Sequence, residues 1–146
     1  MSLSNAAETD LLNLLFTNTN WANLGDATGL RGATVPGSYF ISLHTADPGE
    51  TGNQTTSETT YTGYSRVAVA RSGAGWTVSN PTVSNAAVVT FGLCTAGTAT
   101  LTHFSIGRDT SGTGEIIISG ALTQSLVVNP GITPSFAIGQ LSATAD

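Results

Sequence analysis

Few side chains in this sequence offer a nucleophile or a general base. The chain has two histidines, one cysteine and no lysine. A hydrolytic site needs a nucleophile, a base and an orienting group within reach of one another. No Gly-x-Ser-x-Gly motif accompanies His44 or His103, and Cys94 has no neighbouring cation in the sequence that would activate its thiol. We therefore expect structural histidines, an inert buried thiol and no enzymatic activity.

Carboxylates offer two further kinds of chemistry. Asp47, Glu50 and Glu58 share one loop that is rich in carbonyl and hydroxyl oxygens, and such loops can hold Ca²⁺. Their spacing matches no known calcium loop. Glycosidases use paired carboxylates, for which Glu58 with Asp109 or Glu115 would be the candidates. One cysteine and two separated histidines make no recognised zinc ligand set. We expect no metal and no other cofactor.

The composition excludes several classes of partner. Charged residues make up 9% of the chain, against roughly 25% in typical globular domains. The four cations are scattered arginines, and the net charge is −5, so we expect no nucleic-acid binding. No run of 18 apolar residues is present, and the first residues do not resemble a secretory signal, so we expect no membrane span and synthesis in a reducing cytoplasm. A surface of hydroxyls and amides suits a protein that packs against others.

One amphipathic helix is predicted, over residues 5–17. Asn5 and Glu8 stand at the spacing of a capping box, and Leu11 belongs to a wide apolar stripe with its neighbours on the helical wheel. Such a helix either plugs one end of a β-core or also docks on a neighbouring subunit. Trp21 follows in a turn-rich segment as an expected core anchor.

The rest of the sequence predicts short strands separated by Gly, Pro and Asn. Residues 64–71 alternate most clearly and hold half of the positive charges, at Arg66 and Arg71. The near-continuous apolar runs at 115–119 and 125–128 are expected to be central or buried on both faces. The remaining expected strands cover residues 38–44, 76–79, 87–91, 98–106 and 132–141.

This pattern favours a mainly β fold. We expect one domain over residues 1–146, an antiparallel β-sandwich of the jelly-roll type with the N-terminal helix attached. Residues 49–62 form a loop that is too long to be a simple connection, and binding surfaces tend to lie in such loops.

Three stretches carry a resemblance to a known group of proteins. Residues 42–49 (Ser-Leu-His-Thr-Ala-Asp-Pro-Gly), residues 61–71 followed by Gly75-Trp76, and residues 102–107 resemble tailed-bacteriophage virion proteins. Members of that group are capsid cement (decoration) proteins or tail-fibre components. The resemblance covers about residues 5–120, and its signatures look like determinants of fold and turns.

The resemblance implies a structural role in the virion. Of the two roles, the sequence is interpreted as that of a capsid cement protein. Homotrimers of such a protein would bind the major capsid protein on the outer capsid surface and stabilise the shell against internal DNA pressure. The alternative is a tail-fibre or tail-tip component that binds a host receptor. The residues predicted to contact a partner are Leu11, Leu15, Phe16, Trp21, Glu50 and Glu58.

Overall fold

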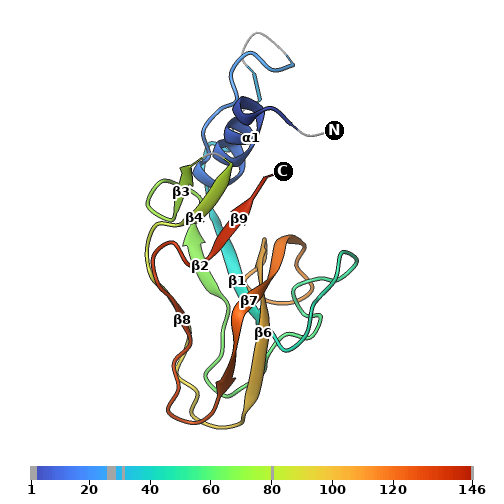
Figure 1. Ribbon diagram of the computed structural model, residues 1–146, viewed down its shortest axis with the longest axis vertical. Coiled ribbons are helices and arrows are strands. Elements are labelled where there is room, and N and C mark those ends of the chain that lie inside the picture. Colours follow the sequence, from blue (N-terminus) through green and yellow to red (C-terminus); the bar gives the residue numbers. More distant parts are fainter. Residues whose placement is uncertain (1–2, 26–28, 31, 80, 146) are drawn as a thin grey trace. The chain divides into compact units, whose positions relative to one another are not determined.

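The computed structural model describes residues 3–25, 29–30, 32–79 and 81–145 (Figure 1). It confirms a mainly β protein with antiparallel sheets and one N-terminal helical segment. The chain divides into two compact units, which are described separately. We call residues 1–38, 70–89 and 136–146 the helical unit, and residues 39–69 and 90–135 the four-stranded unit. The jelly-roll arrangement stays a prediction.

The helical segment covers the predicted residues, but its start and its last turn differ from expectation. Helix α1 (Asn5–Leu12) continues as one π-helical turn, η1 (Asn13–Thr17). Its N-cap is Ser4, whose hydroxyl accepts a hydrogen bond from the backbone of Ala7, so the capping box predicted from Asn5 is wrong. A hydroxyl one residue earlier satisfies the free N–H groups of the first turn equally well.

Two contacts hold the end of this segment inside the helical unit. Phe16 is fully buried and meets the ring of Trp76 edge to face at 4.9 Å. The guanidinium of Arg71 donates to the carbonyls of Leu14 and Leu15, in the last turn of the segment. A cation at a helix C-terminus also opposes the negative end of the helix dipole. Arg71 therefore acts as a C-terminal cap for η1.

The helical unit also contains a three-stranded antiparallel sheet. Its order is β3 (Trp76–Ser79), β4 (Thr82–Asn85) and β9 (Ser142–Thr144). Strand β4 was not predicted, because Pro81 was expected to end the strand run. In the structure the proline precedes β4, where its missing N–H costs no ladder bond. The amide of the buried Asn85 donates to the carbonyl of Ala137 and accepts from the backbone of Leu141, which ties the C-terminal segment to β4.

The four-stranded unit is built around a sheet of order β2-β1-β6-β7. Its strands are β1 (Ser38–His44), β2 (Val67–Ala70), β6 (Ala99–Gly107) and β7 (Ile116–Val128). Strands β1 and β6 pair antiparallel from Phe40 opposite Gly107 to His44 opposite His103. The fully buried apolar side chains of this unit include Ile41, Leu43, Leu101, Ile106 and Val128.

Strand β7 contradicts the expectation of two central, buried strands. The two predicted segments are joined in one strand of 13 residues, which lies at the end of the sheet order. Opposite β6 its register shifts between Leu101 and His103, so the residues between Ala121 and Leu126 form an irregularity. Val127 is 52% exposed. An apolar run indicates a strand, but it does not reveal whether another strand follows it in the sheet.

The remaining expected strands are shorter than predicted. Strand β5 (Val89–Thr90) pairs with β8 (Ser135–Phe136). Between β8 and β9 the chain turns, with Gly139 at a φ of +78°, so residues 132–141 do not form one strand. In the described part of the chain, no helix has the length and apolar character needed to cross a membrane.

Candidate functional site

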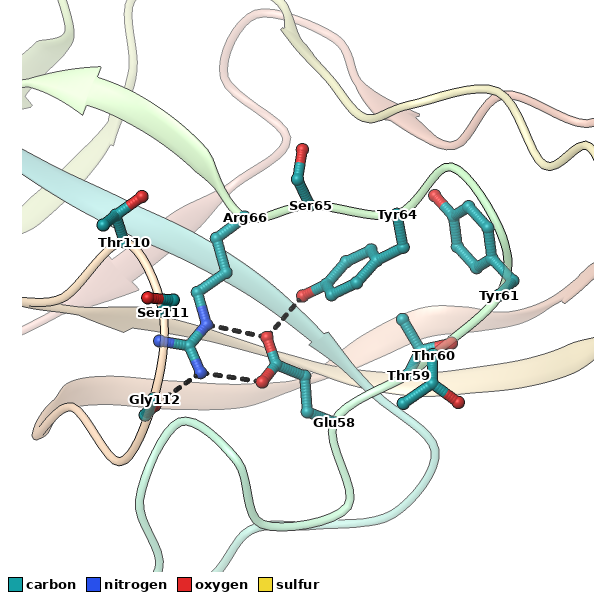
Figure 2. A pocket seen from close by; sticks show the side chains of 10 residues that line it. All are labelled: Glu58, Thr59, Thr60, Tyr61, Tyr64, Ser65, Arg66, Thr110, Ser111 and Gly112. Carbon is teal, nitrogen blue, oxygen red and sulfur yellow. Dashed lines mark hydrogen bonds and ion pairs between the residues drawn. The ribbon is translucent and has the colours of Figure 1, made fainter.

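An open pocket with a volume of about 420 Å³ lies in the four-stranded unit (Figure 2). One side comes from the end of the long loop and the residues before β2, and the other side from the turn between β6 and β7. Hydroxyl-bearing side chains dominate its lining, and the buried pair of Glu58 and Arg66 lies among them. The lining residues are Glu58, Thr59, Thr60, Tyr61, Tyr64, Ser65, Arg66, Thr110, Ser111 and Gly112.

The segment 64–71, which carries the clearest strand pattern, is only partly a strand. Strand β2 begins at Val67, whereas Tyr64 and Arg66 turn their side chains toward Glu58 (Figure 2). Val69 is buried while Ala68 and Ala70 are exposed, so the predicted alternation holds within β2 itself. The predicted strand start was three residues too early because side-chain bonding to the loop replaces sheet pairing there.

Glu58 and Arg66 form a two-point ion pair. Nε of Arg66 donates to Oε1 of Glu58, and Nη2 donates to Oε2, both at 2.7 Å. The side chains are only 14% and 3% exposed, respectively. The bonded carboxylate raises the pKa of Arg66, against the opposing effect of burial. Arg66 therefore stays charged, and the pair holds the loop end against the start of β2.

Arg66 also holds the turn between β6 and β7. Its Nη1 donates to the carbonyl of Asp109 at 3.0 Å, and its Nη2 donates to the carbonyl of Gly112 at 2.8 Å. With the two bonds to Glu58, these use four of the five guanidinium N–H groups. One N–H on Nη1 has no acceptor among the described residues. Arg66 thus links the two walls of the pocket, and Gln54 adds a second link, because its side chain accepts from the backbone of Asp109 and its backbone N–H donates to the carbonyl of Gly114.

Tyr64 links the ion pair to the sheet. Its hydroxyl donates to Oε1 of Glu58 at 2.9 Å and accepts from the backbone N–H of Leu43 at 3.1 Å. Burial raises the pKa of Tyr64, so the hydroxyl stays protonated and keeps donating. Its ring packs edge to face on Tyr61 and stacks on Phe91. The aromatic rings therefore fix the backbone on one side of the pocket.

Gly63 and Gly92 allow the segment that carries Tyr61 and Tyr64 to lie close to residues 92–95. The backbone N–H of Thr95 donates to the carbonyl of Thr62, next to Gly63, which has a φ of +103°. A Cβ at Gly92 would collide with the carbonyl oxygen of Gly63. Only glycine permits both this positive φ and this close approach of two backbones.

Replacing Gly92 with alanine is expected to lower the free energy of unfolding by at least about 1 kcal/mol, because the added methyl group has no space. Urea denaturation followed by tryptophan fluorescence measures the change. Gly73→Ala is the matched control, since a Cβ there meets nothing within 4 Å. Equal stability of the two variants would show that the backbones separate easily at this point.

A buried polar cluster lies in the same unit, under the loop of residues 49–62. Nδ1 of His44 lies 2.8 Å from the carbonyl of Thr56, and Nε2 lies 2.9 Å from the hydroxyl of Ser105. Ser105 is hydrogen-bonded to Ser42, which accepts from the buried amide of Gln54. Burial lowers the pKa of His44. A neutral His44 fits its carbonyl partner as an Nδ1–H donor.

The residues that were predicted to contact a partner fall in both units and differ in burial. Phe16 is fully buried, so its side chain stabilises the helical unit. Leu11, Leu15 and Trp21 are half-buried and Glu50 is exposed. Glu58 belongs to the pocket. The assignment of these residues to an interface stays a prediction.

The carboxylates do not form the sites that were considered from the sequence. Among the described residues, no three His, Cys, Asp or Glu side chains gather closely enough to hold a metal ion. Both oxygens of Glu58 accept bonds from Arg66, which leaves that carboxylate unsuited to acid–base work. Sequence reasoning missed the pairing with Arg66. Its only signal was an arginine set among apolar strand residues in a chain with few charges.

A family comparison gives the class of protein, a structural component of the phage virion. The family model described as "Podophage GP4 fiber I protein gp80" matches residues 2–144. The chain belongs to this family of phage fibre proteins. No curated protein matches the chain.

Proposed function

We propose that this chain is a fibre subunit that contacts the host cell surface while the phage adsorbs. The observation that carries the proposal is the match of residues 2–144 to a phage fibre family. The family description names a fibre and no capsid contact, so it favours this role over the capsid-cement interpretation. The proposed homotrimer and any contact with the major capsid protein stay predictions.

The surface chemistry of the chain agrees with a contact role. Charged residues make up 9% of the sequence, and the pocket is lined mainly by hydroxyl groups. Neutral hydroxyl surfaces lose less hydration energy on contact than ionised ones do. Adsorption through such a surface is expected to depend weakly on salt, because few exposed charges take part.

An adsorption experiment tests the proposal. Purified chain, added to susceptible cells before the phage, is expected to slow adsorption several-fold by occupying the receptor. The same chain unfolded by heat is the control. Gold-labelled antibodies against the chain are expected to mark the fibres of intact virions. Labelling spread over the capsid shell, together with unchanged adsorption, would overturn the proposal and restore the capsid-cement interpretation.

A further inference from the structure

We propose that the pocket between Tyr64 and the β6–β7 turn binds a neutral sugar residue of a surface glycan. This inference rests on the proposed function, because it gives the receptor a chemical class. Three observations support it: an unpaired N–H of Arg66 in the pocket lining, the hydroxyl-rich walls, and the charge balance of the pocket.

One polar group of the pocket lining lacks a partner among the described residues. It is the remaining N–H on Nη1 of Arg66, whose side chain is only 3% exposed. Buried polar groups are nearly always hydrogen-bonded, so an unpaired one calls for a ligand or a water molecule. The hydroxyl oxygen of Thr59 is unpaired as well, but it is enclosed by protein and does not face the pocket.

The walls of the pocket offer further hydrogen bonds at its mouth. Ser65 and Thr60 are exposed on one side, and Thr110 and Ser111 are exposed on the other. Figure 2 shows the guanidinium of Arg66 between Glu58 and the turn that carries Ser111. Hydroxyl groups both donate and accept, as the hydroxyls of a sugar do. The volume of about 420 Å³ falls within the roughly 300–1,000 Å³ of small-molecule sites.

The charge balance selects a neutral ligand. The positive charge of Arg66 is already opposed by the two-point contact with Glu58. The chain as a whole carries a net charge of −5, which repels anions. A sugar bearing a carboxylate would therefore place an unpaired negative charge beside Glu58. We infer that acidic sugars are rejected.

Binding to glycans released from a susceptible host tests this inference. Oligosaccharides are cleaved from the cell-surface polysaccharide and separated by anion exchange into neutral and acidic fractions. Saturation-transfer NMR with the folded chain is expected to give signals from the neutral fraction only. Absence of signal from the neutral fraction, or signal from the acidic fraction alone, would overturn the inference.

Variants locate the site. Ser111→Phe fills the mouth of the pocket and is expected to weaken glycan binding by at least about tenfold, which corresponds to 1.4 kcal/mol. Thr113→Phe is the matched control, because Thr113 is exposed in the same turn but does not line the pocket. Thr110→Phe, on the same wall, replaces Ser111→Phe as the test if the latter does not fold. Unchanged binding by a folded pocket variant would overturn the site.

The adsorption assay separates this inference from the proposed function. If the Ser111→Phe chain still blocks adsorption as the wild type does, the receptor role stands and the pocket is excluded as its site. If even the wild-type chain leaves adsorption unchanged, the proposed function fails as well. A loss of blocking by Ser111→Phe but not by Thr113→Phe supports both.

Discussion

Replacing Arg66 with methionine is expected to lower the free energy of unfolding by about 3–5 kcal/mol. The change leaves the carboxylate of Glu58, which is only 14% exposed, without its opposite charge. It also removes the donors to the carbonyls of Asp109 and Gly112. The turn between β6 and β7 and the loop before β2 then lose one of their links and keep only the bonds of Gln54 to Asp109 and Gly114. Urea denaturation of the purified chain measures the effect.

The chain contains its own control for this prediction. Arg108 and Glu115 also form an ion pair, at 3.2 Å, but their side chains are 60% and 61% exposed. Arg108→Met is expected to change stability by no more than about 1 kcal/mol, because water solvates both charges when the pair is broken. The double variant Arg66→Met with Glu58→Gln is expected to recover part of the loss, since no buried charge is left alone. Equal effects of Arg66→Met and Arg108→Met would mean that water reaches Glu58 freely.

Lowering the pH from 7 to 5 is expected to destabilise the protein through His44, at a slope of at most about 1.4 kcal/mol per pH unit. Burial holds the pKa of His44 below its ordinary value of 6.5. Below pH 6.5 the unfolded chain therefore binds a proton that the folded chain rejects, and stability falls as the pH falls. The loss levels off once the pH passes the lower pKa of the folded state.

Denaturation series at several pH values between 7 and 5 test this dependence. The variant His44→Gln has no titrating ring and is expected to be less stable at pH 7 but to lose less on acidification. His103→Gln is the control, since it leaves His44 and its partners Thr56 and Ser105 in place. A His44→Gln chain with the wild-type slope would assign the acid sensitivity to other groups.

The spacing of apolar residues in the sequence predicted helices and strands well where that spacing agrees with the burial of the side chains. Residues 38–44 form β1 with the predicted bounds, although Ile41 to His44 are all buried rather than alternating, and residues 5–17 are helical throughout. Predictions from the sequence pattern failed where tertiary contacts decide how a helix begins or where a strand lies in the sheet. Ser4, not Asn5, is the N-cap of the helix, because the hydroxyl of Ser4 accepts the hydrogen bond from the backbone of Ala7. Strand β7 reads as central from its composition, yet it lies at the end of the sheet.

The pocket could not be predicted from the sequence, because its members meet only in the fold. Glu58 and Arg66 are near one another in the chain, but a loop glutamate and a strand arginine usually point apart or into water. Gly112 comes from a turn that is 46 residues away from Arg66 in the sequence. The sequence does show that charged residues are scarce, and for this reason an arginine among apolar strand residues stands out.

The position of β7 has a consequence for the time between synthesis and assembly. None of its 13 residues is charged and none is a proline, so two of the devices that usually keep sheet edges apart are missing from this strand, and only the irregularity between Ala121 and Leu126 interrupts its edge. Encounters between free edges are second-order, and their rate grows with the square of the subunit concentration. A cell that fills with new subunits faster than virions take them up would therefore accumulate aggregates. The synthesis of this chain and its incorporation into virions therefore have to rise together during infection.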